Sequence, residues 1–291
     1  MTFVRRKIDL TFILGTGEFG NSGFNTVKVT GKRVQVNIQN TNGPAMGQAQ
    51  VRVYGLTRSM LNHLSAINAG DMAQRNNRLV IEAGDDVAGM ATVFDGNIKM
   101  GQINLSGAPD SNLVVVGYAG LLGATQIIPP SSYPETADVA TIMADLAHLM
   151  NLEFENNGVS APLSTQYLPG SPREQADRCA AAAHIDWFVD GRTMVILPKG
   201  GSRGGYIPTI SPETGAVGYP GYSTSVYGIT MQTLFNPLLR TKGLVKVESG
   251  LEVANGTWQI FNLVHDLESE TPGGQWFTRF DGASLHVGAP K

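Results

Sequence analysis

The sequence predicts a mainly β protein in which two small antiparallel β-barrel-like domains flank a central α/β module of helices and a hairpin. Alternating apolar residues fill both ends of the chain, a helix followed by a hairpin lies between them at residues 171–198, and 35 glycines among 291 residues indicate many tight turns. The predicted domains are residues 1–127, 128–200 and 201–291, the last opening with a loop arm.

The first predicted domain is a sequence of short strands with one helix. Apolar residues alternate with others at Ile8, Leu10, Phe12 and Leu14, as in a half-buried strand. Thr57 is a predicted N-cap for a helix whose buried side is Met60, Leu61 and Leu64. The remaining predicted strands are 26–29, 32–39, 49–54, 79–83, 91–102 and 113–117, with turns at 42–44, 84–86 and 108–110.

The segment from Gly15 to Gly20, GTGEFG, matches the dinucleotide-binding fingerprint letter for letter. The fingerprint requires its third glycine to open a helix whose N-terminus receives the pyrophosphate. Here residues 26–29 instead have a strand pattern. We therefore predict a glycine-rich loop between two strands, and no cofactor.

The central module is predicted to start after the proline-rich boundary at residues 129–134. A helix follows, with Glu135 and Asp138 near its positive end and His148 in solvent. Its buried face is Val139, Ile142, Met143, Leu146 and Met150.

A second helix of this module begins at Ser171, which forms a capping box with Glu174, while Pro172 occupies the first helical position. Its face of small residues, suited to close packing, is Ala176, Cys179, Ala180 and Ala183. Residues 185–189 and 193–197 then form a hairpin, and Asp190-Gly191 is predicted to supply both positive-φ positions of a type I′ turn.

Residues 200–228 lack periodicity and are rich in Gly, Pro, Ser and Tyr, which predicts a long surface loop or an arm that reaches a neighbouring subunit. The last domain then follows as four strands. They are residues 226–234, 243–248, 257–268 and 275–280.

Charge and cysteine content limit the function classes. The net charge of −3 does not indicate a nucleic-acid or membrane-surface partner for the whole chain. Residues 121–200 carry 9 acidic and 4 basic groups, an asymmetry that would suit contacts between subunits. No run of 18 apolar residues predicts a membrane-spanning segment, and the single Cys179 fits a protein made and kept in the cytosol.

Few residues indicate chemistry. No common hydrolase, metalloprotease or nucleotide-binding motif occurs, and Cys179 and His184 are predicted to diverge across a helix end. Asp266, Glu268 and Glu270 alternate on one strand, so they could gather a hard cation, or form a solvated face that repels edge-to-edge pairing. Hence the sequence predicts no catalytic, cofactor-binding or metal-binding residues.

Aromatic residues leave a second choice open. Trp258, Trp276, Tyr219 and Tyr222 could stack on sugars or belong to a core or an interface. Basic residues such as Arg279 form no stripe that could follow a phosphate backbone, so sequence-specific nucleic-acid binding is not expected.

Two segments are similar to a known family. Residues 49–64, AQVRVYGLTRSMLNHL, resemble the first domain of tailed-bacteriophage baseplate hub proteins, the Mu-like tail hub family. The last domain of that family is similar to residues 235–278, with FNPLL, GLVKV, NGTWQIFNLVHDL and GQWFT. The order of β-domain, central α/β module and β-domain also fits.

The resemblance implies a structural role without turnover. Hubs of this family are trimers whose paired barrels give pseudo-sixfold symmetry, where the tail tube or a distal tail protein meets one face and the spike the other. The expected partners are two further copies of the chain, tube, spike and other baseplate proteins, and the expected location is the virion tail baseplate after synthesis in the host cytoplasm.

Two alternatives stay open at this point. One is a tail-associated peptidoglycan hydrolase that uses an acid among Asp266, Glu268 and Glu270. The other is a soluble carbohydrate-binding β-protein that depends on Trp276. The sequence contains no positive signal for either.

Overall fold

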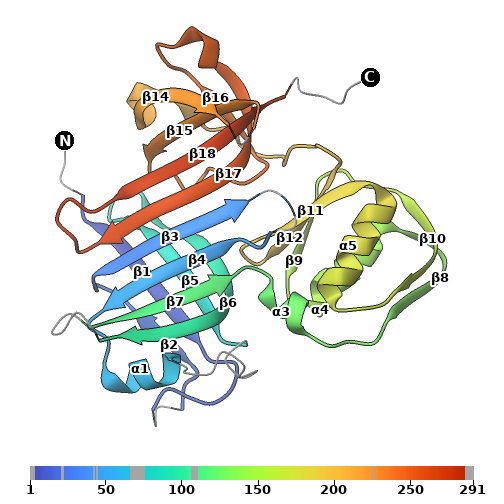
Figure 1. The fold of residues 1–291 in the computed structure, drawn as a ribbon, viewed down its shortest axis with the longest axis horizontal. Coiled ribbons are helices and arrows are strands. Elements are labelled where there is room, and N and C mark those ends of the chain that lie inside the picture. The colour runs from blue at the N-terminus through green and yellow to red at the C-terminus, as the bar shows by residue number, and fades with distance from the viewer. Residues whose placement is uncertain are drawn as a thin grey trace.

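A single thirteen-stranded sheet joins the two β-rich ends of the chain (Figure 1) in a computed structural model that describes residues 4–20, 23–41, 43, 45–65, 76–105, 111–224 and 226–285. The main path of the sheet is β14-β15-β18-β17-β3-β4-β7-β6-β5-β1-β2, and β16 pairs with both β13 and β17. The prediction of a mainly β protein with a central α/β module is confirmed. The described strands of the two β-rich ends share this one sheet, and no closed barrel is found among the described strands.

The N-terminal part follows the predicted alternation. Ile8, Leu10 and Phe12 are buried on one face of the first strand. The strands of this part are β1 (Arg6–Ile13), β2 (Thr26–Val29), β3 (Val34–Thr41), β4 (Gln48–Tyr54), β5 (Arg78–Asp85), β6 (Gly89–Asn104) and β7 (Asn112–Tyr118). The GTGEFG segment connects the antiparallel strands β1 and β2, which confirms a loop and not a dinucleotide-binding turn.

The described residues of the N-terminal part contain one helix, α1 (Arg58–Leu64), and Thr57 caps its N-terminus. The hydroxyl of Thr57 accepts the backbone N–H of Met60 at 3.3 Å, as the sequence predicts. Of its predicted buried side only Leu64 is fully buried. The predicted turns at 42–44 and 108–110 fall mainly on residues outside the described ranges.

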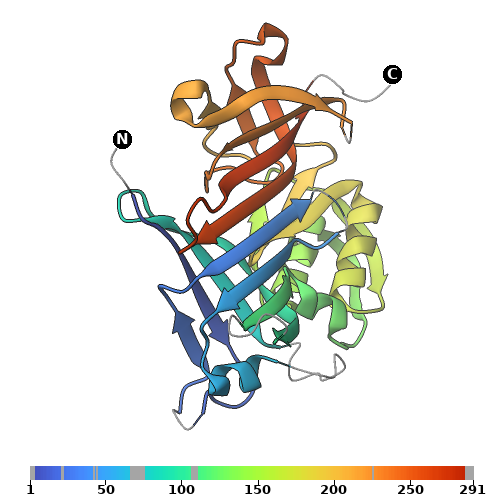
Figure 2. The same ribbon diagram turned by 60° about the vertical axis from the view of Figure 1, so that its left-hand side comes forward.

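Strand β17 connects the two halves. It pairs with β3 from Asn262 opposite Thr41 to Ser269 opposite Val34, and on its other edge with β18. The C-terminal strands are β13 (Thr209–Ile210), β14 (Ala216–Ser223), β15 (Gly228–Leu234), β16 (Leu244–Val247), β17 (Gly256–Ser269) and β18 (Trp276–Ser284), with 3-10 turns η1 (Pro212–Thr214) and η2 (Glu252–Ala254). Figure 2 shows β17 and β3 side by side.

The prediction of a loop over residues 200–228 is wrong for much of this segment. Ala216–Ser223 forms β14, which pairs with β15. The pairing is interrupted between Val217 and Gly221, and this irregularity accommodates Gly218 and Pro220. A bulge shifts the alternation of inward and outward side chains along a strand. For this reason the segment shows no periodicity in the sequence although it belongs to the sheet.

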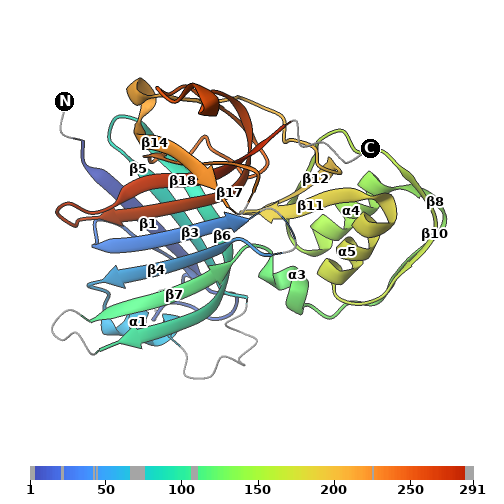
Figure 3. The same ribbon diagram turned by 45° about the horizontal axis from the view of Figure 1, so that its top comes forward.

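The central module packs α4 (Val139–Leu149) against α5 (Pro172–Ala183) beside the hairpin (Figure 3). All five residues of the predicted face of the first helix are buried. Asp138 is its N-cap, but the prediction for Glu135 is wrong, since this residue lies in a strand. The additional elements are α3 (Leu121–Thr125), β8 (Ser131–Asp138), β9 (Glu153–Asn156), β10 (Pro162–Leu168), β11 (Ile185–Asp190) and β12 (Thr193–Pro198).

Strands β8 and β10 form a separate two-stranded ribbon that the sequence does not predict. Pro134 lies within β8, and proline is tolerated there because each strand of a two-stranded ribbon has an edge that needs no partner. The capping box of α5 is confirmed: the backbone N–H of Ser171 donates to Glu174 at 2.8 Å, and its hydroxyl accepts the N–H of Glu174 at 3.4 Å.

The hairpin is confirmed, but its predicted turn type is wrong. Asp190 pairs with Thr193, so the two loop residues are Gly191 and Arg192. Gly191 has a φ of 58°, and Arg192 is not among the residues with positive φ. A single positive φ at the first loop position is the pattern of a type II′ turn.

Replacing Gly191 with Val should lower the free energy of unfolding by about 1–2 kcal/mol, because a β-branched residue is strained at positive φ. Space is not the cause, since a Cβ there would approach nothing closer than 3.9 Å. Urea denaturation of Gly191→Val measures the loss. Gly250→Val is the control, an exposed glycine that lacks positive φ. Equal stability of both variants would refute the turn assignment.

Candidate functional site

The three acidic residues singled out from the sequence do not converge. The Nδ2 of Asn37 donates to Asp266 at 2.6 Å, and the Nε2 of Gln35 donates to Glu268 at 3.3 Å. Glu270 lies beyond the end of β17 with a φ of 52° and binds Arg5. Within the described ranges, no group of three His, Cys, Asp or Glu side chains could hold a metal ion.

The predicted role of this acidic face in repelling edge-to-edge pairing is also wrong. Strand β17 is an interior strand, paired with β18 on one edge and with β16 and β3 in turn on the other. Its carboxylates instead accept hydrogen bonds from amides of the neighbouring strand. They are part of a cross-strand polar row on the outer face of the sheet.

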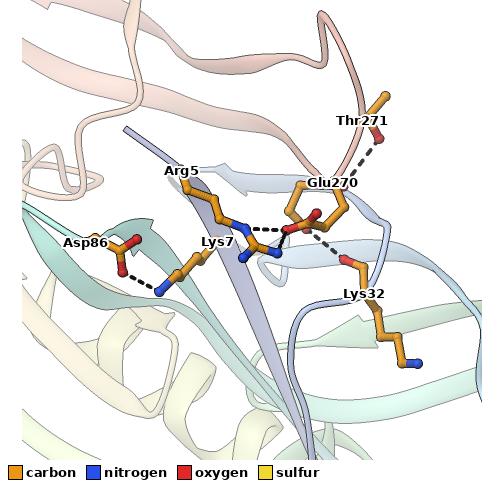
Figure 4. Close-up of polar contacts among 7 residues, drawn as sticks. Arg5, Lys7, Lys32, Asp86, Glu270 and Thr271 are labelled. Carbon is orange, nitrogen blue, oxygen red and sulfur yellow. Dashed lines mark hydrogen bonds and ion pairs between the residues drawn. The ribbon is translucent and has the colours of Figure 1, made fainter. Parts of the chain in front are cut away.

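Side chains join the first strand to the end of β17 (Figure 4). The guanidinium of Arg5 donates twice to one oxygen of Glu270, at 2.9 and 2.6 Å, and Arg6 donates to the carbonyl of Gly274 at 3.0 Å. The hydroxyl of Ser269 donates to the carbonyl of Lys32 at 3.2 Å. The sheet thus curls until β1 contacts β17, and the bonds of Arg5 and Arg6 join the start of β1 to the segment between β17 and β18.

The tryptophans are not available for stacking on sugars. Trp276 is 6% exposed and packs edge-on against Phe235, with ring centroids 5.3 Å apart. Trp258 is half-buried, and its Nε1 donates to the carbonyl of Ala254 at 2.9 Å. The core alternative therefore holds for both.

Exposed tyrosine side chains are frequent on the C-terminal strands and loops, within a stretch of the sequence that carries little charge. Tyr219 and Tyr222 of β14 are 74% and 70% exposed. Glu213 is the single charged residue in the sequence between Gly204 and Leu239. The exposed apolar and tyrosine side chains of this surface, called the tyrosine surface below, are Tyr206, Ile207, Val217, Tyr219, Tyr222, Tyr227, Leu234, Leu238, Leu251 and Val253.

Depletion of charge together with exposed aromatic residues is typical of the buried core of a protein–protein interface. Part of this surface is continuous, because the ring of Tyr219 lies 3.6 Å from the Cβ position of Gly250, which precedes Leu251. The arrangement therefore suits contact with another protein surface.

Residues 199–204, here called the strap, connect the central module to the C-terminal strands. Arg203 is buried, and its Nε and Nη2 donate to Glu155 at 2.8 and 2.6 Å while Nη1 pairs with Asp190. Burial opposes the charge of Arg203, but its bonds to the two carboxylates outweigh this and raise its pKa. The hydrogen bond from Arg203 also lowers the pKa of Glu155.

A second buried cation lies on the other side of the strap. Lys242 is 4% exposed, and its Nζ is 3.3 Å from Asp186, which also binds Lys199 at 2.7 Å. Burial opposes ionisation of Asp186, yet these bonds together with the N–H of Gly200 lower its pKa. Arg203 and Lys242, two cations of the same chain from outside the central module, therefore offset part of its acidic excess.

Local sequence patterns do not indicate the buried roles of Arg203 and Lys242. The available signal was the acidic excess of residues 121–200, which requires cations from outside that module. A cleft of about 680 Å³ lies beside the strap, lined by β6, β9, the turn of the hairpin and residues 237–240.

Cys179 and His184 do not form a catalytic pair, as the sequence predicts. Cys179 is buried in α5, and burial raises the pKa of its thiol to about 11. His184 is exposed at the end of the helix, and His148 is exposed on α4, as predicted. A thiol with a raised pKa in an apolar environment is unreactive.

The length and apolar character of a helix decide whether it can span a membrane. Among the helices of the described ranges, none has both the length and the apolar character that a membrane-spanning helix needs.

Solved structures of tail proteins share this fold. A tail protein from Neisseria meningitidis MC58 aligns with a TM-score of 0.63 at 9% identity, covering 96% of this chain and 97% of that one. The 43 kDa tail protein of prophage MuSo2 from Shewanella oneidensis aligns with a TM-score of 0.61 at 10% identity, covering 94% and 96%.

A third similar structure is an Escherichia coli component of the type VI secretion system that resembles the T4 bacteriophage tail proteins gp27 and gp5. It aligns with a TM-score of 0.57 at 10% identity over 88% of this chain and 74% of that one. At such identities the likeness shows the fold alone. A search of the curated proteins finds no match.

The family model for baseplate hub gp41 matches residues 11–275, which is most of the chain. This match agrees with the resemblance noted in residues 49–64 and 235–278 and with the tail-protein fold. The chain therefore belongs to the baseplate hub gp41 family, and it is a structural protein of the phage tail baseplate.

Proposed function

We propose that three copies of this chain form a closed ring in the baseplate, with the tail tube or a distal tail protein on one face and the spike on the other. Each chain would contribute both β-rich ends, which gives pseudo-sixfold symmetry. Family membership supports the hub role. The observation that carries the assembly is the tyrosine surface, which is too poor in charge to suit a face that meets only water.

The ring requires a heterologous contact, in which one surface of each chain meets a different surface of the next. The tyrosine surface is one candidate side of that contact. Tyrosine supplies a large rigid ring and a hydroxyl, and so it combines apolar burial with hydrogen bonding at low entropic cost.

The domain organisation belongs to this proposal: residues 1–127 and 201–291 as β-domains around the module at 128–200. Three clusters of buried side chains, around Phe12, Ile142 and Phe280, support it, and the first of them also takes in Val189, Leu267 and Trp276 from the other two parts. We also propose that the chain carries out no catalysis and is made in the host cytoplasm. The dispersed partners of Asp266, Glu268 and Glu270 support the first of these.

Light scattering across a concentration series tests the ring. We expect a species of about 93 kDa, three times the chain mass of 31.0 kDa. Tyr219→Arg combined with Tyr222→Arg should shift the equilibrium toward the monomer, because two charges would be buried in the contact.

Tyr167→Arg is the matched control, since Tyr167 is 66% exposed on β10, outside the tyrosine surface. It should leave the mass unchanged. A stable dimer or tetramer would contradict the threefold ring, and an unchanged mass in the double variant would remove the tyrosine surface from the contact.

A further inference from the structure

We propose that the strap is a releasable latch that sets the angle between the central module and the C-terminal strands. The inference goes beyond the proposed ring, because it concerns one chain and can be tested on a monomer. When the latch opens, the module turns relative to the sheet and the adjoining cleft of about 680 Å³ changes shape.

The strap binds the module through ions and amides. Arg203 binds Glu155 of β9 and Asp190 of β11, so one buried guanidinium holds two strands of the module. The N–H of Gly204 donates to Oδ1 of Asn157 at 3.0 Å, and the N–H of Gly200 donates to Oδ2 of Asp186 at 3.0 Å. This half of the latch is polar throughout.

The same six residues also bind the C-terminal strands. The N–H of Arg203 donates to the carbonyl of Lys242 at 2.8 Å. The Nε2 of Gln259 on β17 donates to the carbonyl of Gly201 and to the hydroxyl of Ser202, both at 2.8 Å. Lys242 has a φ of 64° and directs its Nζ across the boundary to Asp186.

Apolar contacts join the module to the main sheet through Val189 of β11, which belongs to the core of the N-terminal sheet. The buried cluster on the hairpin consists of Phe188, Val195 and Leu197, and it is separate from the core of the C-terminal strands. When one partner of a buried ion pair is removed, the other is left as an uncompensated charge, which is strongly destabilising. The members of a buried ionic network therefore stabilise the structure only together. At the strap, the contacts between the module and the C-terminal strands are therefore a small number of ionic and polar ones that can open together.

Two variants test the latch. Arg203→Gln removes the central cation. The triple variant Glu155→Gln, Asp190→Asn, Arg203→Gln removes the charges together and leaves no carboxylate unpaired. Lys246→Gln is the control, because Lys246 pairs with Glu248 at 2.7 Å on the surface and bridges no domains.

The readout is the distance between spin labels at His148→Cys on α4 and Arg279→Cys on β18, both exposed positions outside the tyrosine surface, while the buried Cys179 stays unlabelled. We expect a single narrow distribution in the wild-type background and in Lys246→Gln, and a broader or shifted one in both latch variants. An unchanged distribution in a triple variant that still melts cooperatively would overturn the proposal.

Hydrogen exchange on the unmodified protein gives a test that does not depend on variants folding. The amides of Gly200, Arg203 and Gly204 should exchange at least tenfold faster than those at the centre of α4, because the latch opens without global unfolding. If these amides exchange only as fast as the centre of α4, the strap is a fixed part of the fold and the latch does not exist.

Discussion

Lowering the pH from 7 to 5 should reduce the free energy of unfolding by about 2 kcal/mol through His265 alone. Burial lowers the pKa of His265 to about 4 from its ordinary value of 6.5. Between these values the unfolded chain binds a proton that the folded protein does not bind. The stability is therefore present above pH 6.5 and is lost progressively as the pH falls toward 4.

The surroundings of His265 favour its neutral form. The hydroxyl of Thr278 accepts the N–H of Asn236 at 3.1 Å and lies 2.9 Å from Nδ1 of His265. Protonation would place a positive charge in a buried site beside the ring of Phe235, whose centroid is 5.6 Å away.

Urea denaturation at pH 7, 6 and 5 measures this effect. His265→Gln should lose much less stability over the same interval than the wild-type protein, whereas His148→Gln, the same change at an exposed histidine, should behave like the wild type. Glu155 and Asp186 do not interfere, because their lowered pKa values keep them ionised throughout this window. An equal pH dependence in His265→Gln and the wild type would refute the assignment.

Features determined by neighbouring residues could be predicted from the sequence. The alternation in residues 6–14, the capping box at Ser171 and the apolar face of α4 are local patterns, and each is confirmed. The hairpin was also predictable, but its turn type was not. The choice between Asp190-Gly191 and Gly191-Arg192 depends on a shift of the pairing by one residue, which the strand sequences do not determine.

Features that depend on distant partners were missed. The sequence around Glu135 is typical of the start of a helix. In the structure this segment is a strand, because it pairs with β10, about thirty positions later in the chain. Arg203 lies among glycines and serines, and its burial becomes visible only when Glu155 and Asp190 are placed around it. Likewise, the acidic strand resembles an exposed edge until β3 pairs with it across more than 200 residues.

Replacing Phe280 with Ala should cost about 3–5 kcal/mol and should loosen the C-terminal strands without loosening the central module. Phe280 is 1% exposed on β18, opposite Leu263 of β17 and Met231 of β15. These residues share one buried cluster, whereas Leu267 and Trp276, farther along the same two strands, belong to the cluster of the N-terminal sheet. Because β17 is also paired with β3, we expect the loss of stability to extend from the C-terminal strands to β3.

Hydrogen exchange by residue distinguishes this pattern from uniform destabilisation, with Ile142→Ala as the matched variant in the central module. Ile142 is fully buried, so its truncation should cost about 2–5 kcal/mol and speed exchange in α4 and α5. In Phe280→Ala the faster amides should instead lie in β15, β17 and β3. If either variant accelerates exchange equally in all of these elements, the chain unfolds as one unit. The proposed division at residues 128 and 200 would then be wrong, because a shared sheet and a strap would have bound three separate cores into one cooperative structure.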